Sequence, residues 1–206
     1  MSQTQPLQLT IKSSIFDRDR LLTIDTNFIE FDDNDLITKP PTKFLKSDIK
    51  SFRCGITWIK GYQFIIGRIF FIDIKDKSDK IIKLRLKSIY GIRKKLLTDK
   101  YAQIITTLHD NFFDDIARQY LTQFDNNNDF ELGGLFFSQK GLSFDKNSAF
   151  IPWENIGTSS YWIYYTIYPK TDANAYKSFE YLHDWNARTV YSVSRQILKN
   201  KGLYTE

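Results

Sequence analysis

The sequence predicts a mainly β protein that also contains helices (α+β), arranged as two similar domains. Three observations predict this class. Of 206 residues, 42% are hydrophobic and 16% aromatic, with only 9 Gly and 5 Pro, a composition typical of a strand-rich globular chain. A set of segments in the first half of the chain recurs in the second half, and each half ends in an apolar pattern with a helical period.

The recurring segments are a hairpin and the stretch that follows it. Residues 23–31 and 136–144 each alternate apolar and polar side chains around a short turn. Residues 44–49 then correspond to residues 151–156. Each half continues with a predicted pair of long strands, at 62–74 and 81–88 in the first and at 161–168 and 175–182 in the second, with a polar turn over 73–80 in the first pair.

Helical spacing of apolar residues closes each half, over residues 97–108 and 187–198. A third helical pattern, at 113–124, precedes the polar run 125–129 and predicts a connecting helix and loop. We therefore expect a first domain at 7–111, a connecting segment at 112–129 and a second domain at 130–206. A single continuous β-rich domain is the alternative.

This order of elements resembles tandem pleckstrin-homology-like (PH-like) domain proteins of an uncharacterised bacterial type. The resemblance is carried by Lys140-Gly141-Leu142-Ser143-Phe144, by Ile151-Pro152-Trp153-Glu154-Asn155-Ile156 and by the terminal helix, and it covers residues 7–201. It implies that each domain is a strand meander, or partly open barrel, closed by a C-terminal helix. It also implies a non-catalytic binding or scaffold module, because such folds bind lipids, peptides or proteins and are rarely catalytic.

The charge and cysteine content restrict the remaining classes of function. Cys54 is the single cysteine, so neither an internal disulfide nor a cysteine metal cluster is expected. No stretch is long and apolar enough for a transmembrane segment, and residues 1–14 are too polar for a signal peptide. These features favour a soluble, cytoplasmic protein.

Residues with catalytic potential are few and scattered. His109 and His183 each precede an Asp, Cys54 follows Arg53, and Gly133-Gly134 lacks the Lys-Ser/Thr of a phosphate loop. None of these residues has the spacing of a nucleophile with its base or of a metal-ligand set. We expect no enzyme activity, no cofactor and no metal site.

Positive charge concentrates in the first half of the chain. Residues 1–111 carry 20 Lys and Arg against 13 Asp and Glu, whereas residues 112–206 carry 9 against 11. Alternation over residues 81–87 places the side chains of Lys83, Arg85 and Lys87 on one strand face, with Lys94 and Lys95 just beyond it. This stripe predicts contact with an anionic membrane surface, with nucleic acid as a less favoured ligand. An ordinary solvated strand face is the alternative.

Aromatic residues concentrate in the second half, over residues 161–168. A strand here would have two apolar faces, and only one is needed for a core. Trp162, Tyr164 and Tyr168 lie on the surplus face. This face predicts either packing against the other domain or contact with a protein or peptide partner.

Overall fold

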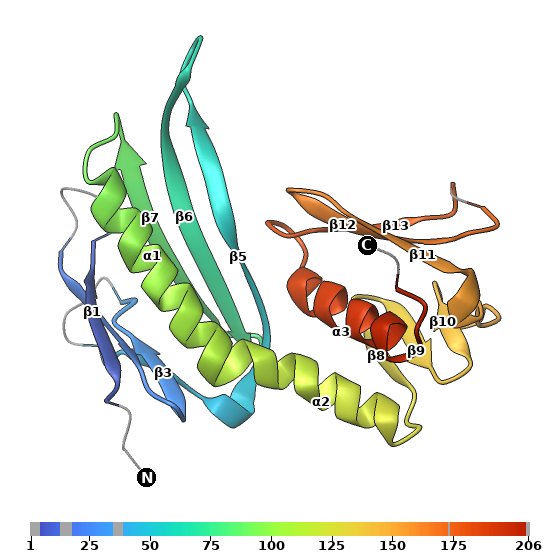
Figure 1. The fold of residues 1–206 in the computed structure, drawn as a ribbon. Helices are drawn as coiled ribbons and strands as arrows, with labels where there is room; N and C mark the ends of the chain where they lie inside the picture. The colour runs from blue at the N-terminus through green and yellow to red at the C-terminus, as the bar shows by residue number, and fades with distance from the viewer. Residues whose placement is uncertain (1–4, 13–17, 35–38, 173, 205–206) are drawn as a thin grey trace. The chain divides into compact units, whose positions relative to one another are not determined.

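The computed structural model describes residues 5–12, 18–34, 39–172 and 174–204. The chain folds as two compact units, Met1–Asp114 and Asp115–Glu206. Both consist mainly of small antiparallel sheets with helices beside them (Figure 1). The predicted class, mainly β with helices, is confirmed.

The first unit contains two antiparallel sheets and a closing helix. The first sheet has the order β1 (Leu7–Ile11), β2 (Arg20–Ile24), β3 (Phe28–Phe31) and β4 (Thr42–Leu45). A short 3₁₀ helix, η1 (Lys46–Asp48), leads to the second sheet, β5 (Ile49–Lys60), β6 (Ile65–Asp76) and β7 (Ile81–Ile89). Helix α1 (Lys94–Leu108) follows.

Side chains from both sheets and from α1 form the core of this unit. Ile29 of the first sheet, Leu84 of the second and Ile104 of α1 are each at most 2% exposed. The helical spacing of Leu97, Ile104 and Leu108 predicts this buried face of α1, and all three are buried. The core therefore uses the apolar pattern that identified the helix in the sequence.

Helix α1 is followed in the chain by two further helical elements. A π-helical turn, η2 (His109–Phe113), joins it to α2 (Asp114–Asp125). The ring of Phe113 stacks on Phe52 of β5 at 3.5 Å between centroids, so the turn belongs to the first unit. Phe124 of α2 lies in the core of the second unit. A helix is present where the connecting helix was predicted, because α2 covers most of residues 113–124.

The second unit has the same general order as the first, but its strands are shorter and its first sheet has three strands instead of four. Its first sheet is β8 (Phe130–Leu132), β9 (Leu135–Ser138) and β10 (Gly141–Ser143), with an isolated bridge from Leu142 to Ile151. After η3 (Trp153–Asn155), the second sheet is β11 (Ile156–Ser160), β12 (Tyr164–Pro169) and β13 (Lys177–Glu180). Helix α3 (Ala187–Asn200) closes the unit and packs on β12 and β13.

Several sequence predictions are confirmed by these elements. Both hairpins are present, as β2–β3 and β9–β10, and both closing helices form. The 3₁₀ helices η1 and η3 begin at Lys46 and Trp153, at corresponding positions of the predicted repeat, and each leads directly into the first strand of a three-stranded sheet.

Other predictions of strands are wrong. Each second sheet has three strands where two were predicted, because β5 and β11 lack a clear alternating pattern. In β5 the register shifts between Ile49 and Ser51, which interrupts the alternation, and β11 consists largely of small polar residues. The predicted strands at 62–74 and 161–168 each begin three residues too early, because β6 starts at Ile65 and β12 at Tyr164.

Candidate binding surfaces

The basic face of β7 is present but is interrupted by an ion pair. Ile82, Leu84 and Leu86 are buried, whereas Lys83 and Lys87 are exposed, as the alternation predicts. Arg85 between them is only partly exposed. Lys83 and Lys87 are four residues apart, or about 13 Å along the strand.

The partner of Arg85 is Asp73 of β6, a carboxylate that is only 1% exposed. Nη1 of Arg85 lies 2.6 Å from Oδ1 of Asp73, and Nε of Arg53 lies 3.1 Å from Oδ2. A buried carboxylate needs such partners, since removing an unpaired charge from water costs several kcal/mol or more. Arg85 therefore has a structural role, while its place in an anion-binding stripe stays a prediction. Asp73 lies in β6, so the prediction that it belongs to a turn is wrong.

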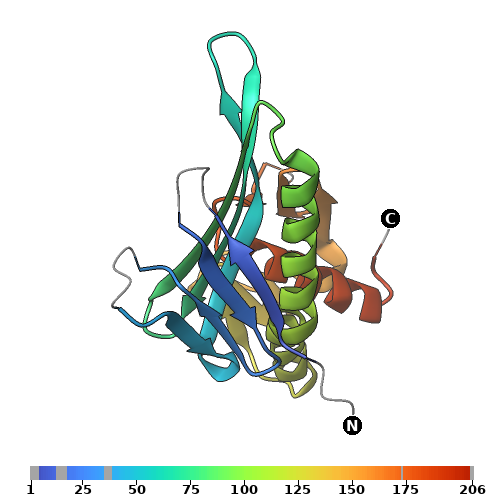
Figure 2. The same ribbon diagram turned by 90° about the vertical axis from the view of Figure 1, so that its left-hand side faces the viewer.

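Lys87, at the far end of this face, lies with Lys94 and Lys95 at one end of the first unit. The β5–β6 hairpin extends past the end of β7 and the start of α1, as Figures 1 and 2 show. At its tip the exposed fractions are 99% for Tyr62, 66% for Phe64 and 56% for Ile65. The hairpin therefore ends in apolar side chains that contribute nothing to the core.

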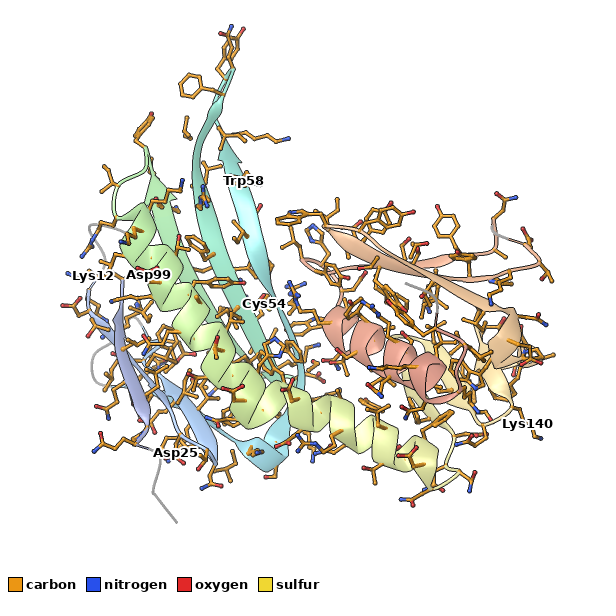
Figure 3. The ribbon with its side chains drawn as sticks, viewed as in Figure 1. Lys12, Asp25, Cys54, Trp58, Asp99 and Lys140 are labelled. Carbon is orange, nitrogen blue, oxygen red and sulfur yellow. The ribbon has the colours of Figure 1, made fainter. Side chains whose placement is uncertain are left out.

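The outer half of the hairpin continues this exposed apolar character. Trp58 on β5, labelled in Figure 3, is half exposed. The guanidinium group of Arg68 on β6 lies 4.7 Å from the centre of the Trp58 ring. The two residues are direct partners in the register of the strands. This cation–π contact holds a positive charge beside the apolar tip.

The β7–α1 turn lies against the base of the projecting part. The backbone N–H of Tyr90 donates to the carbonyl oxygen of Ile66, at 2.7 Å. Tyr90, Ile92 and Leu96 are exposed, so this turn adds to the apolar surface. We call residues 58–68 and 87–96 together the basic apolar end of the first unit.

The charges of the basic apolar end are all positive. Residues 58–68 and 87–96 contain no Asp or Glu. Their cations are Lys60, Arg68, Lys87, Arg93, Lys94 and Lys95. Within the described part of the chain, Lys87, Lys94 and Lys95 make no ion pair with an acid. The surface therefore presents uncompensated positive charge beside apolar side chains.

A hollow of about 400 Å³ lies at the same end, between β1, β7 and the first turns of α1. Lys12, Lys87, Arg93 and Lys100 line it, with Asp19 as the acidic residue of the lining. Lys12 pairs with Asp19 at 3.2 Å, and Lys100 donates to the carbonyl oxygen of Thr10. Among the described residues of the lining, Lys87 and Arg93 have no acidic partner, which extends the cationic surface toward β1.

The predicted aromatic face of the second unit is present in part. Tyr164 and Tyr168 lie on the outer face of β12, away from α3, and are partly exposed. Trp162 is not on the strand, because Tyr161–Ile163 form the turn between β11 and β12, where the Trp162 side chain is 96% exposed. Sequence analysis missed Tyr176, which joins the same outer face from the segment before β13.

The inner face of β12 belongs to the core. Tyr165 is fully buried, and its hydroxyl group lies 2.8 Å from Oγ of Ser194 on α3. Burial raises the pKa of the Tyr165 phenol above its ordinary value of 10.0. Packing by α3 therefore fixes which face of β12 is available to a ligand.

The residues with catalytic potential have local structural neighbours. His109 is 3.3 Å from Oδ1 of Asp114 and packs edge-on against Phe113, while His183 is 3.7 Å from Oε2 of Glu180. Cys54 is buried within β5. No group of three or more His, Cys, Asp and Glu side chains suited to a metal ion occurs among the described residues.

Comparison of the chain with protein-family models, with curated proteins and with solved structures finds no significant match. Among the described helices, none has both the length and the apolar character needed to cross a membrane.

Proposed function

We propose that this protein is a non-catalytic binding module of two PH-like domains that associates with anionic membrane surfaces through the basic apolar end. The order of elements supports the PH-like assignment, since the first unit has sheets of four and three strands followed by a helix. The membrane proposal rests on one observation, the exposed apolar hairpin tip beside cations with no acid in either segment.

The apolar part of this surface favours insertion into a lipid interface. Exposed apolar patches mark interaction sites in proteins, and scattered single residues do not. Tyr62, Phe64 and Ile65 are adjacent at a hairpin tip, where burial in the boundary between headgroups and acyl chains requires no rearrangement of the core. Full burial of one such side chain contributes about 1.5–3 kcal/mol.

The charged part favours an anionic surface over a neutral one. Each Lys or Arg near the surface of an anionic bilayer contributes about 1 kcal/mol at physiological salt. Lys94 and Lys95 are both exposed at the start of α1, beside the turn that contacts the hairpin. Charge and apolar area therefore act at the same end of the unit.

Nucleic acid is the second candidate ligand, because it is attracted by the same cations. The two ligands make different demands on the hairpin tip. Ile65 has no role in a phosphate contact and cannot stack on a base as an aromatic ring does. If Ile65 and Phe64 both contribute to the binding affinity, the ligand is therefore a bilayer rather than nucleic acid.

The test is co-sedimentation of the full chain with vesicles of phosphatidylcholine and phosphatidylserine, compared with vesicles of phosphatidylcholine alone. We expect binding to the first and little to the second. Lys94→Glu with Lys95→Glu should weaken the binding at least tenfold. The matched control, Lys77→Glu with Lys80→Glu, makes the same change in net charge at the β6–β7 turn and should have a smaller effect.

A second pair of variants tests the apolar tip. Phe64→Ser with Ile65→Ser should weaken vesicle binding about tenfold or more, because two inserted side chains are lost. Leu21→Ser with Leu45→Ser, at residues about half exposed on the first sheet, should leave it unchanged. Wild-type protein that ignores anionic vesicles at low salt, or tip variants that bind as well as wild type, would refute the proposal.

A further inference from the structure

The outer face of the second sheet of the second unit carries a groove with a polar floor. Ser159 on β11, Thr166 on β12 and Ser178 on β13 lie side by side across the three strands. All three line a hollow of about 500 Å³. Their side chains are small, so they leave a depression along this row, and their hydroxyl groups form its floor.

Tyrosine side chains rise on both sides of this floor. On one side Tyr161 stacks on Tyr164 at 4.5 Å between ring centroids, and on the other side lie Tyr168 and Tyr176. Tyr164 and Tyr168 are each two residues from Thr166, so each wall begins about 7 Å from the floor row. The walls close the groove along the strand direction.

The ring of Tyr168 is held in place by Gly157. These residues are partners in the β11–β12 register, and a Cβ atom at position 157 would lie 2.5 Å from the Tyr168 ring. The ring therefore rests on the bare backbone of the glycine. A wall that is fixed before ligand binding loses less side-chain entropy on binding.

The charge of the groove is negative. Glu180 pairs with Tyr164 in the β12–β13 register and is the one ionisable carboxylate of the lining, and His183 lies 3.7 Å from its Oε2 atom. No Lys or Arg is among the described residues that line the groove. By contrast, Arg188 lies over Tyr181 and Arg195 over Tyr191 in the same unit, at 4.9 and 4.8 Å.

We infer that this groove binds a small organic cation, a quaternary ammonium group on a polar body. Tyrosine rings present a negative face to a cation, and aromatic walls are the usual means of recognising quaternary ammonium groups. Glu180 adds a full negative charge beside the Tyr161–Tyr164 stack, and the hydroxyl floor can bond the polar body. The volume is that of a small-ligand site.

Other classes of ligand fit these residues less well. A phosphate or carboxylate would meet a carboxylate with no cation in the lining. An extended peptide that ran along the strands would collide with the tyrosine walls. The inference does not depend on membrane binding by the first unit, because all of the lining residues belong to the second.

The experiment is a titration of the full chain with choline and with its uncharged carbon isostere, 3,3-dimethylbutan-1-ol, followed by amide NMR shifts. The two probes have the same shape and differ in charge. We expect choline to shift the signals of Gly157, Thr166 and Ser178 with a dissociation constant on the order of 1 mM. Equal binding of the isostere, or no shift with choline, would overturn the inference.

Variants locate the response within the groove. Tyr164→Leu and Glu180→Gln should each weaken choline binding about threefold to fivefold, the effect of one exposed cation–π or ionic contact. Tyr181→Leu removes a ring outside the lining and should leave binding unchanged. Gly157→Ala keeps every lining side chain but displaces the Tyr168 ring, so it should also weaken choline binding. A wild-type pattern of the other amide signals verifies that this variant is folded.

Discussion

The structural role of Asp73 could not be recognised from the sequence. Its neighbours Ile72 and Ile74 are buried, but the charged residues that follow from Lys75 are typical of a polar turn, and the sequence analysis included Asp73 in that turn. In the structure Asp73 is buried in β6 and forms ion pairs with Arg53 of β5 and Arg85 of β7. Alternation predicts the direction of Arg85, but only the register of three strands shows that its charge is already neutralised.

The first prediction concerns Arg85. Arg85→Ala should lower the free energy of unfolding by about 2 kcal/mol, because it leaves one oxygen of a buried carboxylate without its cation. Lys83→Ala, two residues away and exposed, should change it by less than about 0.5 kcal/mol. Urea unfolding of both variants measures the difference, and equal stabilities would show that Asp73 needs no second arginine.

At the scale of elements, the errors in strand prediction occur at equivalent places. The turns of the β5–β6 and β11–β12 hairpins both carry large apolar residues, Tyr62 and Phe64 in one and Trp162 in the other. Residues of this kind favour strands, so the sequence predicts strands that begin too early. The fold needs none of these side chains for its core. Disagreement between propensity and position is expected at functional surfaces.

Elements with a local signal were predicted well. The helices α1 and α3 and the hairpins β2–β3 and β9–β10 are defined by patterns within about 15 residues. The groove on the outer face of the second sheet of the second unit could not be predicted, because its floor joins Ser159, Thr166 and Ser178 from three strands. Tyr176 was missed for the same reason, since its place beside Tyr168 depends on the β12–β13 turn.

The second prediction tests how the first sheet of the second unit is closed. Leu142 and Ile151 exchange two backbone hydrogen bonds, and a Cβ atom at Gly141 would lie 2.0 Å from the carbonyl oxygen of Ile151. Gly141→Ala should therefore cost about 2–3 kcal/mol and remove this bridge. Hydrogen exchange should show lost protection of the Leu142 and Ile151 amides.

A second glycine provides the control for this change. Gly202 has a φ of +70°, and a Cβ atom there would have no neighbour within 4 Å. Gly202→Ala adds backbone strain of about 1–2 kcal/mol without a clash, and it should not affect the Leu142–Ile151 bridge. Unchanged protection in Gly141→Ala would contradict the prediction, because it would mean that the backbone accommodates a Cβ atom at position 141 while the Leu142–Ile151 bridge stays formed.

At the scale of the whole molecule, the two units differ in charge and in the surfaces that they offer. Residues 1–114 carry most of the positive charge, and their candidate surface combines cations with apolar side chains. The candidate site of the second unit combines tyrosines with a carboxylate. A repeated order of elements thus carries two unlike surfaces, since a fold by itself does not determine a ligand.

The last prediction separates the charged and apolar contributions to membrane binding by salt. Raising the salt concentration from about 0.1 M to 1 M shortens the screening length from about 10 Å to 3 Å, which weakens attraction between exposed charges and a surface. Wild-type binding to phosphatidylserine vesicles should therefore fall at least tenfold over this range. Lys94→Glu with Lys95→Glu should bind more weakly at low salt and depend less on salt, because fewer attractive charges remain to be screened.

The apolar variant should behave in the opposite way. Phe64→Ser with Ile65→Ser should weaken binding by the same factor at both salt concentrations, because burial of apolar area does not depend on screening of charge. Partition of the protein onto vesicles, measured across the salt series for wild type and both variants, gives the two contributions separately. If the Lys77→Glu, Lys80→Glu control reduced the salt dependence as much as the change at Lys94 and Lys95, net charge rather than the basic apolar end would govern the attraction.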